Sequence, residues 1–486
     1  MLLLIDKNKA EPIFQQLIHQ IKYLIENGDL KEGFQMPSSR QLATSLGINR
    51  STVIRAYEEL WSLGYLDSTP GSFTRVRKRK ILKSNPSEET ANENFWENSL
   101  VNNFPEQIYR PSNHISDNYN KNINFHRLEP DVRLINKKSF SICYNKAINE
   151  TNYNIFGYCQ SQGYKPLRQV IASHMRLHSV NVTVDNILIT NGSQNSLQLI
   201  FQAFVGKDDI IAVESPTYSM LIPLARFSHC KIIEIPVNND GLDINILKKH
   251  LKKNKIKMLF TMPTFQNPTA ITMPQNKREE LLSICEKNSI ILIEDSIEEE
   301  LKYFGKVHLP IKSIDHKNIV IYLGTFSKVL SPGLRLGWII ADKECIRKLT
   351  ALKTIFDLST NTFSQVLIYH FCNLGYYELH LRKCLRAFRK RMKVALKALK
   401  QYLPSEKASW NEPLGGFLIW VKIKINAQNI NIEDHLSKFG VSVVDGKNFF
   451  IKPTNETFIR ISISNCNESE IEEGIKRIGI ALNAIN

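Results

Sequence analysis

Beyond Ile123 the chain repeats one pattern, in which a short apolar run is followed by a few polar residues and then by a longer helical stretch. The runs that predict strands are residues 187–190, 210–213, 231–235, 258–262, 290–294, 319–323 and 338–341. Helical patterns such as 196–204 and 277–287 lie between most of them. Strands that alternate with helices form mostly parallel sheets, which bind ligands at the carboxyl ends of their strands. We therefore predict an α/β domain.

Length and composition exclude several other classes of protein. At about 150 residues per domain, a chain of 486 residues has room for about three structural units. Its apolar runs are far shorter than the roughly 20 residues that cross a bilayer, and Asp6 and Lys7 end the N-terminal run too early for a signal peptide. The eight cysteines include no C-x-x-C pair. We therefore expect a cytoplasmic protein with reduced thiols, without disulfides and without a metal site.

The charge balance suggests a polyanionic partner. Lysine and arginine number 63 against 47 acidic residues, which gives a formal net charge of +16. A diffuse solvated surface would explain the same surplus, so its location matters. The densest basic run comprises Arg75, Arg77, Lys78, Arg79, Lys80 and Lys83. Its place directly after a DNA-reading pattern favours contacts with phosphates over a solvated linker.

The N-terminal eighty residues have a pattern of their own. Apolar residues at helical spacing predict a helix over 13–25 that Gly28 ends. A short second helix is capped by Ser38 or Ser39 and broken by Gly47, and a third begins at Asn49 with polar and cationic groups at its start. This is the helix-turn-helix arrangement. Residues 65–76 then predict a small hairpin, or wing.

Residues 28–76 resemble the winged helix of the GntR class of bacterial regulators. The matching features are the G-x-L-x-x-G turn, Pro37-Ser38-x-Arg40, Leu42-Ala43, Leu46-Gly47, Arg50-x-Thr52-Val53 and Ala56-Tyr57. The resemblance implies a DNA-binding domain over residues 1–77 whose contacts come from Arg40, Arg50, Ser51, Thr52 and Arg55, and from Gly71 and Ser72 in the wing. The alternative is that Arg40 and Arg50 cap helices or pair with Glu58 and Glu59. A basic and polar linker, 78–120, follows, with a short helix expected around 95–101.

Polar residues follow several of the predicted strands. Gly192-Ser193-Gln194 opens a helix, where free N–H groups and the helix dipole favour an anion. Tyr218 can cover a flat ligand, and Asp295 is a carboxylate in an apolar setting. Further along lie Asn267, Thr325, Ser327, Lys328 and Arg335. Pyridoxal 5'-phosphate needs these parts: an amine to bind its aldehyde, an acid at its ring nitrogen and donors for its phosphate.

Residues 121–486 resemble the fold-type I aminotransferases, which have a large α/β domain and a small C-terminal α+β subdomain, here expected from about 376. The resemblance implies that Lys328 carries the aldimine, that Asp295 pairs with the pyridine nitrogen and that Asn267 bonds the ring hydroxyl. It also implies that Tyr218 stacks on the ring, that Arg460 binds a substrate carboxylate, and that Tyr158 reaches the neighbouring subunit's phosphate. The alternatives are a structural Lys328, a helix-capping Asp295, a core-packing Tyr218 and an ion-paired Arg460.

A GntR-type winged helix joined to an aminotransferase-like domain resembles the MocR family of regulators. That resemblance implies a head-to-tail, domain-swapped homodimer that senses pyridoxal phosphate or an amine through the aldimine at Lys328. The usual Glu-Asp-Asp-Tyr motif here reads Glu294-Asp295-Ser296-Ile297, so Asn267 would contact the ring hydroxyl alone. Met220 replaces the carboxylate-binding arginine of the family member that responds to γ-aminobutyrate. A working aminotransferase, or a DNA-binding protein with an inactive scaffold, are the other two hypotheses.

Overall fold

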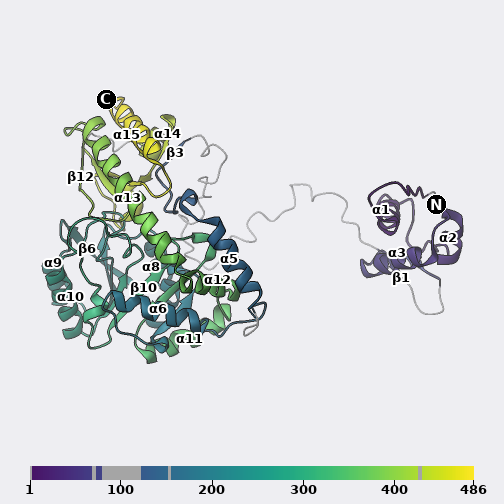
Figure 1. Cartoon of the computed structure of the whole chain (residues 1–486), viewed down its shortest axis with the longest axis horizontal. Coiled ribbons are helices and arrows are strands. Elements are labelled where there is room, and N and C mark those ends of the chain that lie inside the picture. The colour runs from purple at the N-terminus through teal and green to yellow at the C-terminus, as the bar shows by residue number, and fades with distance from the viewer. Residues whose placement is uncertain (1–2, 68–72, 79–121, 151–154, 425–429, 486) are drawn as a thin grey trace. The chain divides into compact units, whose positions relative to one another are not determined.

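A computed structural model gives the fold for residues 3–67, 73–78, 122–150, 155–424 and 430–485. The chain divides into two compact units, residues 1–101 and 102–486, each with its own hydrophobic core (Figure 1). The predicted helix around 95–101 and nearly all of the predicted linker lie outside the described residues. Within the described residues, no helix is both long enough and apolar enough to span a membrane.

The first unit forms the three predicted helices and the base of the wing. Helices α1 (Ile13–Glu26), α2 (Ser39–Leu46) and α3 (Arg50–Ser62) pack around buried apolar side chains such as Leu17, Ile21 and Leu60. Ser38 caps α2 in a capping box, and Asn49 caps α3. The tight turn between α2 and α3 needs Gly47, whose φ is +59°. Strands β1 (Leu66–Asp67) and β2 (Arg75–Val76) pair in antiparallel fashion.

The second unit is built on an eight-stranded sheet of order β4-β11-β10-β9-β8-β5-β6-β7. The strands are β4 (Ile187–Thr190), β5 (Ile210–Ser215), β6 (Lys231–Asn238), β7 (Gly241–Leu242), β8 (Ile256–Thr261), β9 (Ile291–Asp295), β10 (Val320–Thr325) and β11 (Gly337–Ile340). Strands β10, β9, β8, β5 and β6 run parallel, whereas β11 is antiparallel to both of its neighbours. All seven predicted strands are present within a few residues of their expected bounds, and the predicted fold class is confirmed.

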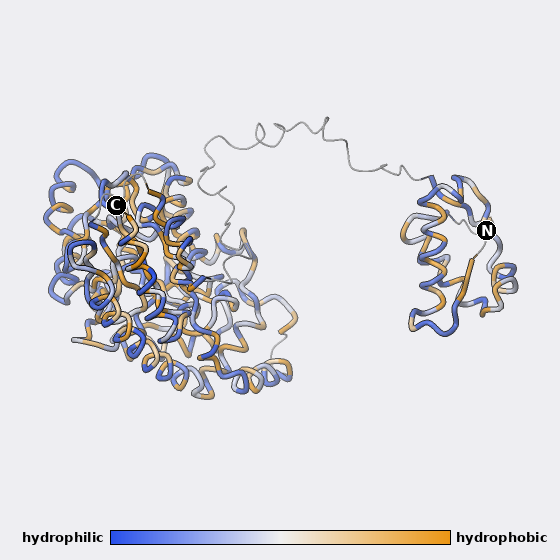
Figure 2. The backbone as a smooth tube through the Cα atoms, turned by 90° about the horizontal axis from the view of Figure 1, so that it is seen from above, coloured by the Kyte–Doolittle hydropathy of each residue, from blue (hydrophilic) through white to orange (hydrophobic). Residues whose placement is uncertain are grey.

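Helices cover both faces of this sheet, as predicted for an α/β domain (Figure 1). The covering helices are α5 (Lys137–Ile148), α6 (Lys165–Leu177), α7 (Ser193–Phe204), α8 (Leu221–Phe227), α9 (Ile244–Leu251), α10 (Gln275–Lys287), α11 (Lys343–Asp357) and α12 (Thr362–Asn373). Alternate strand residues serve opposite faces, since Leu188 packs with α7 while Ile187 and Ile189 pack with α6. Apolar and polar segments accordingly alternate along the helices in Figure 2.

The C-terminal part forms a smaller α+β layer. Its antiparallel sheet has the order β12-β13-β16-β15, with β12 (Ala408–Trp410), β13 (Leu418–Ile423), β15 (Val444–Asp445) and β16 (Thr457–Ser462). The helices α13 (Tyr376–Tyr402), α14 (Ile432–Lys438) and α15 (Glu468–Asn483) accompany it. A short strand, β14 (Val441–Ser442), pairs in parallel with β3 (Ile123–Asn124). The start of the second unit therefore lies beside its end, which matters for the site (Figure 1).

Candidate functional site

The carboxyl ends of the parallel strands gather most of the side chains singled out in the sequence. Asp295 is the last residue of β9, and Lys328 follows β10 by three residues. Lys328 is within electrostatic range of both Asp295 and Arg460 of β16. Tyr218, after β5, is within electrostatic range of Asp295 and Arg460. The structure thus brings the predicted cationic, acidic and aromatic groups to one pocket.

An anion cradle lies at the end of β4. Gly192, with a φ of +95°, occupies the N-cap of α7, so no side chain caps the N–H groups of Ser193 and Gln194. Arg335 donates from Nη2 to the carbonyl oxygen of Asn191 at 2.9 Å. A Cβ atom at Gly192 would lie 3.0 Å from that Nη2, so glycine is needed for the close approach. A helix N-terminus beside a guanidinium is suited to a phosphate.

The predicted hydroxyl donors near the cradle differ in what they contact. Ser327 is buried and its Oγ has no partner among the described residues, so it is available to a ligand. Thr325 donates its hydroxyl to the Leu336 carbonyl at 3.0 Å and accepts the Ser327 N–H at 3.1 Å. The proton of Thr325 is therefore engaged in holding the loop that carries Lys328.

Four ionisable side chains meet at the site: Asp295, Glu298 and Arg460 are buried, and Lys328 is half-buried. Burial raises the pKa of Asp295 to about 7, and a nearby Lys328 partly opposes the shift. Burial lowers the pKa of Lys328, while the negative charge of Glu298 acts in the opposite direction. Burial likewise lowers the pKa of Arg460 to about 10. An amine whose proton is easily lost, next to two buried carboxyl groups, is suited to covalent binding of an aldehyde.

Arg460 and Asn267 lie close together at one wall. Arg460 Nη1 approaches Asn267 Oδ1 at 3.5 Å, and Nη2 donates to the His126 carbonyl at 2.9 Å. Arg460 Nε and Asn267 Nδ2 are buried without partners among the described residues. Arg460 forms no ion pair there, which disfavours the ion-pair alternative for this residue. Both groups can therefore donate to an anionic or phenolic ligand.

The aromatic and flanking residues complete the description. The Tyr218 hydroxyl donates to Gln194 Oε1 at 3.2 Å, and burial raises the pKa of Tyr218 to about 12. Met220, at the N-cap of α8, is exposed and is not part of the buried centre. Tyr158 is also on the surface, with 82% of its area exposed. Within one subunit, then, Tyr158 is the predicted cofactor residue that stands apart from the others.

Glu298 is the main residue that sequence reasoning missed. It lies in the acidic run Glu298-Glu299-Glu300, a pattern that usually marks a solvated surface. Instead it is 1% exposed, both of its carboxylate oxygens lack partners among the described residues, and burial raises its pKa to about 8. Ile297, which replaces the usual tyrosine, packs into the apolar core beneath the sheet. Only the distance of three residues from Asp295 could have drawn attention to Glu298.

Residues 126–134, here called the strap, cover the pocket with backbone groups. The Leu128 carbonyl accepts from Lys328 Nζ at 3.4 Å, and the His126 carbonyl accepts from Arg460. The Arg127 carbonyl accepts from the Ser464 hydroxyl at 3.1 Å. The strap ends in a 3₁₀ turn, η4 (Val132–Leu134). The strap therefore brings residues from the start of the second unit to a site that also contains Arg460, near the end of that unit.

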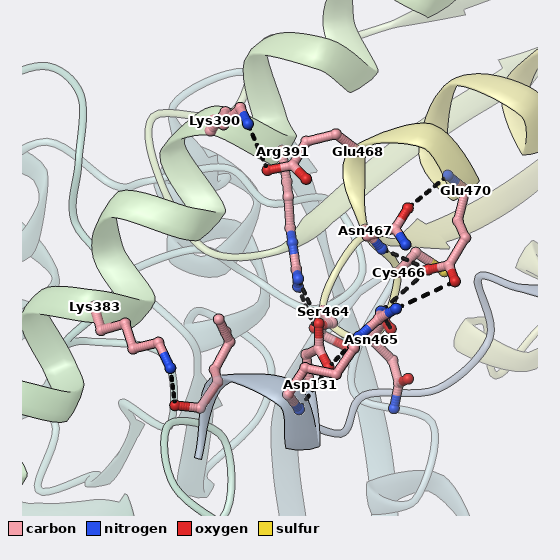
Figure 3. Close-up of polar contacts among 12 residues, drawn as sticks. Asp131, Lys383, Lys390, Arg391, Ser464, Asn465, Cys466, Asn467, Glu468 and Glu470 are labelled. Carbon is pink, nitrogen blue, oxygen red and sulfur yellow. Dashed lines mark hydrogen bonds and ion pairs between the residues drawn. The ribbon is translucent and has the colours of Figure 1, made fainter. Parts of the chain in front are cut away.

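A polar network fastens the strap to the C-terminal layer (Figure 3). Asp131 is buried and accepts hydrogen bonds from Arg133 Nε at 2.8 Å and from the buried Arg391 of α13. Arg391 also donates to the Ser464 carbonyl at 3.0 Å, and Arg133 pairs with Glu470 of α15 at 3.1 Å. Although burial alone would raise the pKa of Asp131, these arginine contacts hold it below its usual range. The network gives each charge of the buried pair at least two hydrogen bonds, although Arg391 Nε has no partner among the described residues.

The winged helix presents the predicted DNA contacts on its surface. Arg40, Arg50, Ser51 and Arg55 are exposed, and Thr52 is half-buried. Arg50 donates from Nε to Ser39 Oγ at 3.3 Å. Among the described residues of this unit, neither Arg40 nor Arg50 pairs with an acidic side chain.

Several cationic side chains of the winged helix are partly covered or paired, and others lie outside the described residues. The guanidinium of Arg55 stacks 3.8 Å above the ring of Phe14, so one of its faces is covered. Gly71 and Ser72, at the wing tip, lie outside the described residues, as do the three basic residues from Arg79 onward. Of the same basic run, Arg77 lies 3.7 Å from Asp67, and Lys78 lies 4.0 Å from Glu32. Part of that charge is therefore neutralised locally.

The residues of the pocket fit pyridoxal phosphate. One oxygen of Asp295 is buried without a partner in the described structure, as expected of an acid that awaits a protonated ring nitrogen. Asn267 Nδ2 can donate to a ring hydroxyl, and Ser327 Oγ can donate to a phosphate. The cradle at Gly192 and the amine of Lys328 supply the two remaining requirements. Orphaned buried polar atoms of matching chemistry are otherwise costly, so a polar ligand explains them.

Comparison with known proteins assigns each of the two units to a family. Residues 133–478 match the family of class I and II aminotransferases, and residues 14–76 match the bacterial regulatory proteins of the gntR family. An uncharacterized HTH-type transcriptional regulator of Bacillus subtilis, YdfD, is 30% identical over 98% of this chain and 97% of its own. Aromatic-amino-acid aminotransferase 1 of Thermococcus litoralis is 36% identical over 66% of this chain and 78% of its own. The crystal structure of Pyrococcus horikoshii kynurenine aminotransferase in complex with PMP has a TM-score of 0.74 and 30% identity, covering 82% of this chain and 99% of its own.

The fold and the site together define a fold-type I, pyridoxal-phosphate-dependent domain that is preceded by a winged helix-turn-helix. The chain belongs to the class I and II aminotransferase family and, with its GntR-type N-terminal domain, to the MocR type of HTH transcriptional regulators. The cofactor prediction and the family resemblance are confirmed. The individual roles of the site residues stay predictions.

Proposed function

We propose that this regulator controls transcription in response to a primary amine or amino acid that binds at the pyridoxal phosphate pocket. The observation that carries the proposal is the convergence of half-buried Lys328 with buried Asp295 and Arg460, in a chain that also presents an exposed cationic helix start. A regulator needs a chemical group that discriminates its effector, and a reactive lysine pocket supplies one.

The cofactor supplies an aldehyde that bonds to primary amines and a ring that withdraws electrons from them. Asp295 would hold a proton at the ring nitrogen, and Lys328 would provide the amine that binds the cofactor. The residues proposed to hold the cofactor are Lys328, Asp295, Asn267, Tyr218, Gly192, Ser193, Gln194, Thr325, Ser327 and Arg335, with Tyr158 acting from the neighbouring subunit. Arg460 would bind the effector's carboxylate.

The effector is proposed to be an amine that carries a carboxylate. Arg460 is buried, keeps unpartnered donor capacity and lies against the Phe449 ring, with its Cζ 5.2 Å from the ring centroid. A carboxylate is the group that a desolvated guanidinium binds best. Met220 stands where the γ-aminobutyrate-responsive family member has an arginine, and a methionine cannot pair with the effector's carboxylate. This argues against γ-aminobutyrate as the effector.

The DNA-binding part of the proposal assigns residues 1–77 to the operator, 78–120 to a linker and 121–486 to the effector domain. The start of α3 would enter the major groove, with Arg50, Ser51 and Thr52 at base edges or phosphates. An Arg50→Ala variant should bind operator DNA about 10-fold more weakly, since a good base contact is worth roughly 1–3 kcal/mol. Fluorescence anisotropy measures this, with Lys22→Ala of α1 as a control for lost charge. Equal losses in the two variants would argue against a specific role for Arg50.

The proposal includes a head-to-tail homodimer in the cytoplasm. Apolar side chains are exposed at the end of α11, namely Ile355, Phe356 and Leu358. Asp357, among them, accepts from Asn191 Nδ2 at 2.7 Å, next to the anion cradle. An apolar patch at the rim of a ligand site supports a second subunit there. Tyr158 would then reach that subunit's phosphate site.

The experiment that tests sensing combines spectroscopy with DNA binding. Cofactor-loaded protein is titrated with a panel of amines and amino acids while its absorbance is followed. One ligand should give a stable spectral change, and the same ligand should change operator affinity. Lys328→Ala should keep its DNA affinity and lose the response, whereas Lys343→Ala, which removes an exposed lysine, should keep both. An unchanged response in Lys328→Ala would overturn the proposal.

A working aminotransferase is the second candidate, because the same contacts serve turnover. It is favoured by the 36% identity to the Thermococcus litoralis enzyme. That match covers 66% of this chain, whereas the match to the regulator YdfD covers 98%, so the regulator is the better supported function. Conversion to the pyridoxamine form by an amino acid, reversed by a keto acid, would establish the enzyme.

A further inference from the structure

A cluster of ligand-type side chains lies outside the pocket just described. His174 lies in the last turn of α6 and His178 is the C-cap residue four positions later, so both imidazoles lie on one side of the helix end. Glu300, in the segment after β9, meets them: its Oε1 lies 2.6 Å from His174 Nε2 and 3.0 Å from His178 Nε2. Neither the folding pattern nor the proposed function uses this cluster. The scattered cysteines gave no indication of it, because its spacing, H-x-x-x-H, involves histidines alone.

The geometry suits a metal ion. The three ligand atoms all lie within 4.8 Å of one another, so one ion can contact all three after small side-chain movements. Two imidazole nitrogens and one carboxylate oxygen form a ligand set that binds Zn²⁺ with a fourth position left open. Softer or harder ions fit less well, since Cu(I) favours sulfur and Mg²⁺ or Ca²⁺ favour oxygen.

The surroundings also hold the ligands in place. The Nδ1 atom of His178 faces Glu299 Oε1 at 3.9 Å, and Glu299 is itself paired with Lys302. At that distance the contact is electrostatic and not a hydrogen bond. The ring of His174 packs edge-on against Tyr377, 5.7 Å between centroids. The side chains of His174, His178 and Glu300 are 16%, 16% and 20% exposed, so an ion can reach them from solvent.

We propose that His174, His178 and Glu300 bind a divalent transition-metal ion of the zinc class, which joins α6 to the segment after β9. Without metal, both imidazoles compete for a single carboxylate oxygen. Glu300 Oε1 already faces the Nε2 atoms of both rings, so the three ligand atoms lie around one centre. Glu300 lies five residues beyond Asp295, so the ion would brace the segment that directly follows the cofactor's acid.

The test is direct metal binding by the full-length, cofactor-loaded protein. Isothermal titration with Zn²⁺ should give one site per chain, and Co²⁺ should give the visible absorption of a four-coordinate ion. His178→Ala and Glu300→Gln should each raise the Kd for Zn²⁺ at least 10-fold. His316→Ala removes an exposed histidine elsewhere and should change nothing. Circular dichroism of each variant checks that it is folded.

Two outcomes would overturn the proposal. One is the absence of a Co²⁺ spectrum and of any Zn²⁺ site, which would leave the cluster as a hydrogen-bonded network. The other is equal Zn²⁺ affinity in His178→Ala, Glu300→Gln and His316→Ala, which would place the ion elsewhere, for example on the cofactor. If His178→Ala does not fold, the Zn²⁺ affinity of Glu300→Gln alone decides the test, because glutamine keeps the shape of the glutamate side chain.

Discussion

Asp295 combines burial with an unsatisfied oxygen, and its charge is therefore costly until a cation lies beside it. A carboxyl whose pKa is higher in the folded chain binds more protons when folded. It therefore favours folding below its ordinary pKa of 3.8, and this contribution is lost as the pH rises through about 7. Asp295 is therefore suited to a cationic ligand, and its burial lowers the stability of the cofactor-free protein at neutral pH.

We predict that cofactor-free protein loses about 2 kcal/mol more unfolding free energy between pH 5 and pH 8 than its Asp295→Asn variant does. The variant lacks the titrating group, so the difference isolates its contribution from those of the buried Glu214 and Glu294. Urea unfolding at the two pH values measures it. With cofactor bound, the difference should shrink, because a protonated ring nitrogen lowers the pKa of Asp295. Equal pH dependence in both proteins would show that Asp295 is already neutralised.

Glu298 gives a second prediction at the same scale. Its negative charge raises the pKa of Lys328, against the lowering by burial. Glu298→Gln should therefore lower the pKa of Lys328, so that cofactor loading reaches its maximal rate at a lower pH. The pH dependence of the loading rate, followed by absorbance, measures this shift.

The matched control for that experiment is Glu294→Gln. Glu294, on β9 four residues before Glu298, is equally buried, but it accepts from the backbone N–H groups of Ile311 and Lys312. Its substitution should leave the pH profile in place. A profile that is the same in Glu298→Gln and in the wild type would mean that Glu298 does not influence the lysine.

At the scale of elements, the parallel strands were the most predictable part of the fold. Runs such as 187–190 are bounded by turn residues, and the side chains that follow such strands must meet at one edge of the sheet. The pocket residues Asp295 and Lys328 could be found for that reason. The strap could not, because His126 and Arg460 are 334 residues apart and no local pattern links them. Glu298 and the Glu300 cluster were hidden in an acidic run whose burial depends on tertiary packing alone.

The strap depends on the buried pair Asp131–Arg391, shown in Figure 3. Asp131→Ala would leave the Arg391 charge buried without its partner, which typically costs about 3–5 kcal/mol. We predict a matching loss of stability in chemical denaturation, together with weaker cofactor binding, because the Leu128 and His126 carbonyls would lose their position. Lys390→Ala removes an exposed pair with Glu468 from the same helix and should cost less than about 1 kcal/mol. Similar losses in both variants would contradict a special role for the strap.

At the scale of the whole molecule, the two units answer different requirements. The winged helix has its own core, and its cationic residues stand on the surface, as a nucleic-acid reader requires. The larger unit gathers buried Asp295, Glu298 and Arg460 around Lys328, as a small-molecule site requires. YdfD matches both units along nearly their full length, so this combination is shared by at least one other chain. Among the described residues, Tyr158 and the apolar end of α11 stay exposed.

The homodimer proposal gives the last prediction. Ile355 is 78% exposed at the end of α11, beside Asp357 and the anion cradle. Ile355→Asp would place a charge in an apolar contact, so dimerisation should weaken at least 10-fold, or about 1.4 kcal/mol. Sedimentation velocity across a range of concentrations measures this. Cofactor affinity should fall in parallel, because Tyr158 would no longer reach the neighbouring phosphate site. Val307→Asp, at a similarly exposed position before η6 (Ile311–Ile314), should stay dimeric, and a dimer unaffected by Ile355→Asp would place the interface elsewhere.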